Sequence, residues 1–293
     1  VAELGERLEA VSGLIDGTVN RPKAAMIFDW ENWWTLEDVS GPRQDISYID
    51  CILDHYQAFW EAGIDMDFVT MDDSLEGYSL VAAPLNYMYK QGYAEKVREF
   101  VEKGGTYVTT YFSGIADETD LCFTGHHPLA DVLGIEQEEI DAPSDEFTNS
   151  FCYGGKEYAA GNLRELIHAG DETEVLSVYS EDYVKGEPVV TAHSFGKGKA
   201  WYLAAAAGED FLRAFYADRL KEAGIGNPLG TELPYGVTVT ERIGNAGKRI
   251  LFVMNFRNEP VTVRGIGSWT DAESGKKYEG ELQLGAFECI MLQ

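Results

Sequence analysis

The sequence predicts an α/β fold with a doubly wound, mostly parallel sheet, followed by a small all-β domain. Short, fully apolar segments such as residues 80–83 alternate with amphipathic segments of helical length as far as Asn227-Pro228. Beyond that point only short strand-like runs separated by turn residues remain. Buried strands that alternate with helices are typical of a parallel sheet covered on both faces. We expect a helical segment at 1–22, an α/β domain at 23–228 and a β domain at 229–293.

The first element is a helix. Leu4, Leu8, Val11 and Leu14 recur at helical spacing before a break at Pro22. The chain begins with neither a Met nor a secretory signal. We therefore expect it to be part of a longer protein, with residues 1–22 as a linker from a preceding domain.

The α/β region is predicted from apolar runs and from the glycines that end helices. Strands are expected at 24–28, 66–69, 80–83, 106–111, 174–179, 189–191 and 199–203, and helices at 49–62, 93–102 and 210–223. Phe195-Gly196-Lys197-Gly198 predicts a tight turn. Residues 136–158 show no clear period, so we expect irregular structure there. The β domain is expected to hold strands at 237–242, 249–256, 261–263 and 288–292.

Composition excludes several classes of partner. There are 50 acidic and 23 basic side chains, a net charge of −27, which disfavours nucleic acid and anionic membranes. The four cysteines are scattered singly, without a pair or His cluster typical of a metal site. We expect no cofactor, no metal and free thiols in a reducing, cytoplasmic compartment.

A group of sequence blocks resembles a known family. Phe28-Asp29-Trp30-Glu31-Asn32-Trp33-Trp34 is similar to the start of the trimerisation domain of glycoside hydrolase family 42 β-galactosidases, and the resemblance continues through residues 56–63, 77–84, 100–115 and 195–202. The blocks occur in family order, and with the closing β segment they cover nearly the whole chain.

The resemblance implies an enzyme's architecture without its reaction centre. In that family a (β/α)8 barrel of roughly 250 residues or more carries both catalytic carboxylates and precedes this region. The middle domain resembles class I glutamine amidotransferases, a flavodoxin-like arrangement, and assembles trimers. The implied function is the non-catalytic assembly portion of an enzyme that hydrolyses terminal β-D-galactosides, with a homotrimer as partner and a galactoside at a subunit boundary as a further option.

The candidate site residues follow the first strand. Asp29, Trp30, Glu31, Trp33 and Trp34 lie where ligands bind in open α/β folds, just past the strand's carboxyl end. The tryptophans are interpreted either as interface anchors or as a sugar platform flanked by acids. We favour the interface, because aromatic residues concentrate at the buried centres of protein contacts.

No catalytic residue is predicted in this chain. Asn258-Glu259 has the Asn-Glu order common at a glycosidase acid/base, but a following proline favours a turn. Ser113 lacks the first glycine of a nucleophile elbow, and Cys122 lacks a positioned base. His126, His127 and His193 are candidates for such a base that the sequence does not place, and we interpret the adjacent pair as surface or capping residues. The acidic exit of the first strand and the hairpin-like Gly196-Lys197-Gly198 disfavour a flavin or phosphate site.

Overall fold

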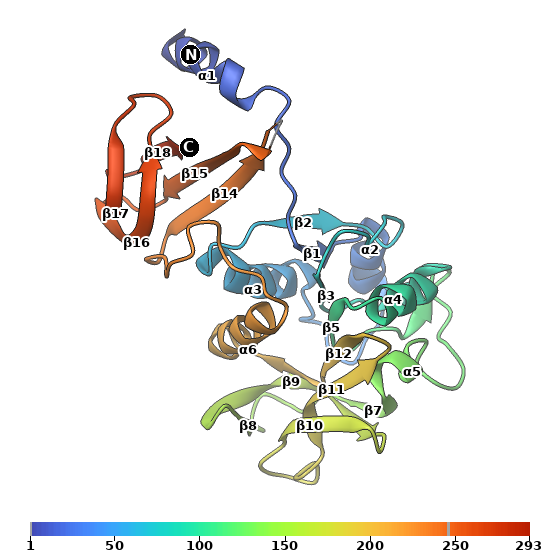
Figure 1. The fold of residues 1–293 in the computed structure, drawn as a ribbon. Coiled ribbons are helices and arrows are strands. Elements are labelled where there is room, and N and C mark those ends of the chain that lie inside the picture. The colour runs from blue at the N-terminus through green and yellow to red at the C-terminus, as the bar shows by residue number, and fades with distance from the viewer. Residues whose placement is uncertain (1, 245–246) are drawn as a thin grey trace. The chain divides into compact units, whose positions relative to one another are not determined.

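The computed structural model describes residues 2–244 and 247–293, which fold as two compact units (Figure 1). The larger unit contains Ala24–Ala58 and Asp67–Ala223. The smaller unit contains the chain up to Lys23, Phe59–Met66 and Gly224–Gln293. The predicted N-terminal helix is present as α1 (Ala2–Ile15). Residue 1, which the prediction included, lies outside the described residues.

A seven-stranded sheet forms the centre of the larger unit. Its strands are β1 (Ala24–Ile27), β2 (Met66–Val69), β3 (Leu80–Ala83), β5 (Thr106–Thr110), β10 (Thr173–Val178), β11 (Pro188–Phe195) and β12 (Gly198–Leu203), in the order β10-β11-β12-β5-β3-β1-β2. The pairs from β12 through β5 and β3 to β1 are parallel, whereas β10, β11 and β12 pair antiparallel. The parallel-rich α/β arrangement is therefore confirmed, with an antiparallel extension at one end.

Helices place apolar stripes against this sheet. The main ones are α2 (Trp30–Asp38), α3 (Tyr48–Glu61), α4 (Tyr93–Glu102) and α6 (Glu209–Glu222), with a short α5 (Ala130–Leu133). In α4 the buried residues Tyr93, Val97, Phe100 and Val101 recur at helical spacing. The predicted helices are present to within a few residues, while α2 was not predicted as a helix.

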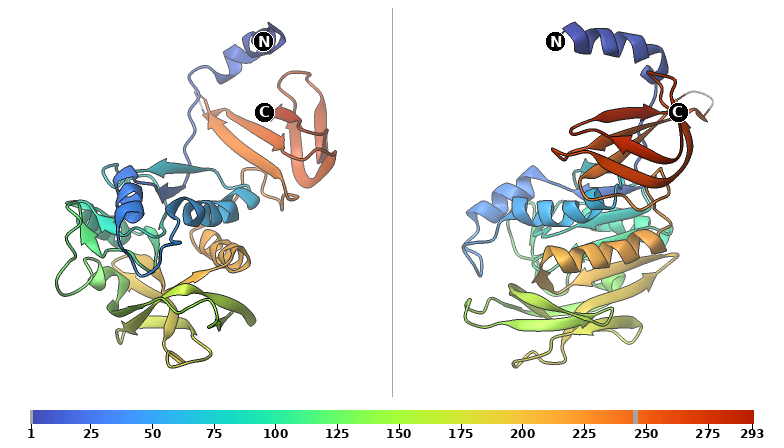
Figure 2. Two further views of the ribbon diagram at one scale, coloured as in Figure 1. Left: turned by 180° about the vertical axis from the view of Figure 1, so that it is seen from behind. Right: turned by 90° about the vertical axis from the view of Figure 1, so that its left-hand side faces the viewer.

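A second sheet corrects the prediction for residues 136–158. Strands β7 (Ile135–Asp141), β8 (Asn149–Tyr153), β9 (Lys156–Ala169) and β13 (Ala205–Ala207) form an antiparallel sheet in which both β7 and β8 pair with β9. The expectation of irregular structure was wrong, because β7 is acidic and mostly solvent-facing and carries little apolar signal. These strands form a layer beside β10 and β11 (Figure 2). A small parallel pair joins β4 (Met88–Tyr89) to β6 (Ala116–Asp117).

The closing segment of the chain is all-β, as predicted. Strands β14 (Val237–Ile243), β15 (Arg249–Asn255) and β18 (Cys289–Leu292) form one antiparallel sheet, and β16 (Val261–Thr270) pairs with β17 (Lys277–Leu284). The sequence did not predict β17, and it predicted only the first residues of β16. One apolar core fills the space between the strands, built from Leu229, Val237, Val239, Leu251, Val253, Val263, Ile266, Leu282, Leu284, Ile290 and Leu292.

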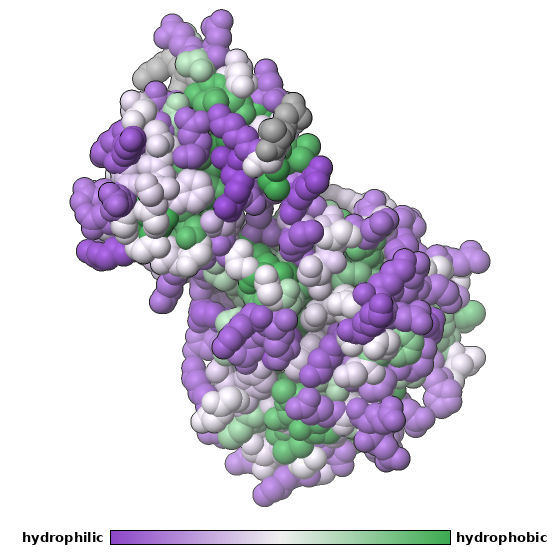
Figure 3. Space-filling view, in the orientation of Figure 1, coloured by the Kyte–Doolittle hydropathy of each residue, from purple (hydrophilic) through white to green (hydrophobic). Residues whose placement is uncertain are grey.

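The surface is largely hydrophilic on the side that Figure 3 draws. Smaller hydrophobic areas lie between the hydrophilic residues. Within the described residues, no helix combines the length and apolarity that crossing a membrane requires. The four cysteines are free thiols.

Candidate functional site

Asp29 begins helix α2 at the carboxyl end of β1. Its side chain accepts a hydrogen bond from the backbone N–H of Glu31 at 3.1 Å, which is the geometry of a helix N-cap. The other carboxylate oxygen accepts the backbone N–H of Met71 at 3.3 Å, and the residue is only 1% exposed. Asp29 therefore fixes the start of α2 against the segment that follows β2.

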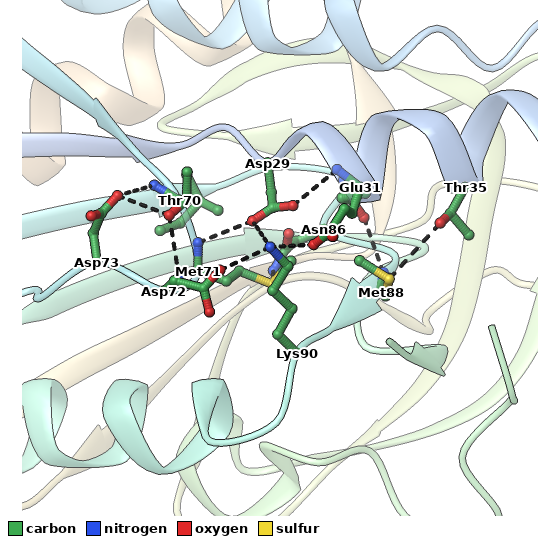
Figure 4. A network of polar contacts seen from close by, with 12 residues as sticks. Asp29, Glu31, Thr35, Thr70, Met71, Asp72, Asp73, Asn86, Met88 and Lys90 are labelled. Carbon is green, nitrogen blue, oxygen red and sulfur yellow. Dashed lines mark hydrogen bonds and ion pairs between the residues drawn. The ribbon is translucent and has the colours of Figure 1, made fainter. Parts of the chain in front are cut away.

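Lys90 gathers three carboxylates around this N-cap (Figure 4). Its Nζ lies 3.0 Å from Oδ2 of Asp29 and 2.9 Å from Oδ2 of Asp72, and it also pairs with Glu31. Burial opposes the charge on the ammonium, but hydrogen bonds to Glu31, Asp72 and Asp29 prevail and raise the pKa of Lys90 above its usual range. One cation therefore serves three anions, and the cluster keeps a net negative charge.

Asn32 anchors the next turn of α2. Its side chain is fully buried, donates to the carbonyl of Leu85 at 3.2 Å and accepts from the backbone N–H of Met88 at 3.0 Å. These contacts join α2 to the segment after β3 on both sides of the amide. The helix is thus held rigidly, which fixes the direction of its outward side chains.

Three tryptophans of α2 form a cluster of aromatic rings with Phe28, which precedes the helix, and with Phe68 of β2. The cluster, here called the α2 aromatic face, consists of Phe28, Trp30, Trp33, Trp34 and Phe68. Trp30 is 53% exposed, Trp34 59% and Phe68 49%. Ring centroids lie 5.3 Å apart for Trp30 and Trp33, 6.3 Å for Trp30 and Trp34, and 5.4 Å for Phe28 and Trp30. Clustered, exposed and rigidly held aromatic rings are the pattern of an interaction surface.

The five predicted site residues therefore divide into two roles. Trp30, Trp34 and Glu31 lie at the surface, and Trp33 is half-buried and donates its indole N–H to Glu37 at 2.8 Å. Asp29 has the second role, because its buried carboxylate accepts two backbone amides and pairs with Lys90 at the start of the helix. The sequence analysis missed Lys90, Asp72 and Asn32. Asp72 follows β2, and Lys90 lies beyond β3, directly after β4. Strands β2 and β3 flank β1, and that placement was the available signal.

The turn that follows β5 leads to strand β6 rather than to a helix, so it is not a nucleophile elbow. Phe112, not Ser113, takes the left-handed φ of 56°, and its N–H donates to Glu165 at 2.8 Å. Ser113 is fully buried, and its hydroxyl accepts the backbone N–H of Asn86 at 3.0 Å. A phenyl ring at the strained position supplies no nucleophile, so this turn has a structural role.

Glu165 lies next to this turn as a fully buried carboxyl. It accepts hydrogen bonds from the hydroxyl of Tyr202 and from the amide of Gln137 at 3.1 Å, besides the N–H of Phe112. Burial raises the pKa of Glu165 to about 7, although these hydrogen bonds oppose the shift. The group connects β9 of the second sheet to β12 and to the turn after β5.

The remaining sequence candidates lie apart from one another. His126 is exposed, as one of the two interpretations of the pair expected. His127 is buried, and its Nδ1 accepts the backbone N–H of Leu129 at 2.9 Å just before α5, a contact of the capping kind that the other interpretation expected. Cys122 is exposed, and the Nδ1 of His193 is bound to the carbonyl of Val132 at 2.9 Å.

In the β domain, Asn258-Glu259 occupies the bend between β15 and β16. Glu259 forms an ion pair with Arg257 there. This arrangement agrees with the turn that the sequence predicted and gives the carboxylate a structural partner.

Comparison with protein families identifies two matches along the chain. Residues 22–226 match the model of the β-galactosidase trimerisation domain, and residues 236–293 match that of the β-galactosidase C-terminal domain. Among curated proteins, the chain is 40% identical to β-galactosidase BgaA of Planococcus sp. over 97% of its length and 38% identical to β-galactosidase Pbg of Clostridium perfringens over 97%.

Solved structures give the same result. The β-galactosidase of Bacillus circulans sp. alkalophilus superimposes with a TM-score of 0.91 at 38% identity, over 99% of this chain and 44% of that one. The Rahnella sp. R3 β-galactosidase superimposes with a TM-score of 0.90 at 37% identity, over 99% of this chain and 43% of that one. The chain thus spans less than half the length of these relatives, with 43% of BgaA and 42% of Pbg covered.

Proposed function

The chain belongs to glycoside hydrolase family 42, and from this we propose that it serves as the assembly portion of a β-galactosidase whose catalytic residues lie outside these 293 residues. The observation that carries the proposal is the match of residues 22–226 to the trimerisation domain of that family. The rigid α2 aromatic face supplies the means, since exposed aromatic anchors on a fixed helix are typical of hot spots in protein contacts.

The proposed partner is further copies of the same protein, in a homotrimer. In a closed ring of three subunits, each contact joins two different surface patches. The α2 aromatic face of one subunit therefore does not pack against the same face of its neighbour. The α2 aromatic face carries Glu31 at its edge and Asp72 nearby in the Lys90 cluster. We therefore expect its complement to be an apolar surface with a basic edge on the neighbouring subunit.

The finer calls on fold and location belong to the same proposal. We assign the α/β part to the class I glutamine amidotransferase-like, flavodoxin-like group, a choice supported by the parallel strands from β12 to β1. We divide the chain into a linker at 1–22, a trimerisation domain at 23–228 and a β domain at 229–293. A cytoplasmic location is proposed on the strength of the four free thiols.

The whole protein is proposed to hydrolyse terminal β-D-galactosides with retention, and the names of its β-galactosidase relatives support the substrate. In this chain the carboxylates of Asp29, Glu31 and Asp72 all pair with Lys90 and take structural roles. Incubation with a chromogenic β-galactoside tests this assignment. We expect no turnover above the buffer rate. Turnover that a carboxylate substitution within this chain abolishes would overturn the proposal.

A sugar platform on the α2 aromatic face is the second candidate. The exposed indoles of Trp30 and Trp34 lie near the carboxylate of Glu31, and rings with acceptors at their edge suit a pyranose. Titration with galactose while tryptophan fluorescence is recorded separates the two candidates. A saturating fluorescence change that Trp34→Ala abolishes supports the sugar platform. A flat response up to tens of millimolar galactose, well above a dissociation constant of ~1 mM, excludes it.

A further inference from the structure

A cavity of about 390 Å³ opens in the larger unit at the carboxyl ends of three parallel strands. Leu85 follows β3, Tyr111 follows β5 and Leu203 ends β12, and all three line the cavity. Ligands of open α/β folds bind at this edge of the sheet, and the volume is typical of small-molecule sites. We propose that this cavity binds a small organic amine as its ammonium ion. The inference does not depend on the assembly function.

The rim of the cavity is closed by Arg43. Its Nε and Nη2 lie 2.7 and 2.6 Å from the carboxylate oxygens of Asp45, and Nη2 lies 3.0 Å from Asp145. Nη1 donates to the carbonyl of Pro143 at 3.1 Å, and Asn162 donates to Asp145 at 2.7 Å. Arg43 thereby joins the loop before α3 to the loop between β7 and β8. The positive charge of Arg43 is therefore already paired with Asp45 and Asp145.

Two further carboxylates of the lining have no such cation. Asp50 and Asp54 come from consecutive turns of α3 and line the same cavity. Neither carboxylate has an ion-pair partner among the residues that the structure describes. Burial, with the nearby charges of Glu209 and Asp50, raises the pKa of Asp54. A site that is short of positive charge favours a cation over a neutral or anionic ligand.

The lining also selects among ligand classes. Four carboxylates (Asp45, Asp50, Asp54 and Asp145) against one guanidinium disfavour phosphates and carboxylic acids. No group of three metal-binding side chains occurs within the described part of the chain, which gives no support for a metal ion. Part of the wall is aliphatic, formed by Ile46, Leu85, Leu163, Leu203 and Leu212, and the lining lacks the exposed indoles on which sugars stack. An alkylammonium matches both features, with its carbon chain on these walls and its charge at Asp54.

A matched pair of probes tests the charge requirement. We expect 1,4-diaminobutane to bind by titration calorimetry and 1,4-butanediol, of equal length but uncharged, to give no heat of binding. Asp54→Asn should weaken diaminobutane binding at least tenfold, whereas Asp171→Asn, an exposed acid outside the cavity, should leave it unchanged. Equal binding of the diol, or equal affinity of Asp54→Asn and the parent chain, overturns the proposal.

The backbone around Asp50 and Asp54 supplies a second, local measurement that requires no variant, because both residues line the cavity. Diaminobutane should slow hydrogen exchange of the peptide that holds them several-fold, as followed by mass spectrometry, and leave the peptide that holds Asp171 unaffected. An unchanged rate in the cavity peptide, or an equal slowing in both peptides, contradicts binding in the cavity. The mass of the particle, measured on the same samples by light scattering, reports separately on the assembly proposal.

Discussion

The Nζ of Lys90 lies 3.0 Å from Oδ2 of Asp29, and this contact joins the segments that follow two adjacent parallel strands. Asp29 comes directly after β1 and starts α2, while Lys90 lies in the segment beyond β3, directly after β4. The ion pair therefore fixes the helix that carries Trp30 and Trp34. Much of the rigidity of the α2 aromatic face depends on this buried contact.

Removing the cation should destabilise the larger unit. Lys90→Met leaves the 1% exposed Asp29 without its ion-pair partner, and we expect a loss of about 3 kcal/mol in the free energy of unfolding. Lys103→Met is the matched control, because its pair with Glu99 is exposed to solvent and its loss should leave the free energy of unfolding nearly unchanged. Urea unfolding measures both. Equal midpoints for the two variants would refute the structural role of Lys90.

Charges placed on the aromatic face should prevent assembly. Trp30→Lys combined with Trp34→Lys removes two exposed anchors, each expected to contribute about 2 kcal/mol or more to the contact. Light scattering should then report single subunits, with an unchanged circular dichroism spectrum. Leu121→Lys, which alters another exposed apolar side chain, should leave the mass as it was. Retention of the assembled mass by the double variant would exclude this face as the contact.

Glu165 should make stability depend on pH. Its pKa is raised from 4.5 to about 7 in the fold, so the native state holds the proton more tightly than the unfolded chain. The stabilisation is therefore fully present below pH 4.5 and is lost as the pH rises towards 7, by about 3 kcal/mol in order of magnitude. Subtracting the pH profile of Glu165→Gln from that of the parent chain isolates this contribution. Parallel profiles between pH 4.5 and 7 would contradict the shift.

Ser113 should prove structural. Ser113→Ala removes the buried acceptor of the Asn86 N–H, and the unpaired donor should cost about 1–3 kcal/mol. A serine-directed fluorophosphonate probe should label neither the parent chain nor the variant. Labelling that disappears in Ser113→Ala would show a reactive hydroxyl.

The parallel sheet was predictable because its strands are buried on both faces and are apolar throughout. Strand β3, with all four residues buried, was predicted at its exact bounds. In contrast, β7 and β17 place many charged residues at the surface, and their order depends on pairing with β9 and β16. A local apolar pattern does not report such pairing.

The candidate site was likewise predictable only in part. The residues Asp29 to Trp34 stood out as an unusual cluster at a strand end, and the structure places them there. The burial of Asp29, however, follows from Lys90 and Met71, which reach it from other strands. In the sequence, a carboxylate beside tryptophans is equally compatible with accepting a hydrogen bond from a sugar and with capping a helix. Only the folded chain separates these two uses.

The mass of the isolated chain in solution tests the central claim most directly. One subunit has a mass of 32.5 kDa. Light scattering across a concentration series should give three times that mass at the upper end, with dissociation on dilution. A constant mass of 32.5 kDa at every concentration would contradict the assignment of this chain as the assembly portion of the enzyme.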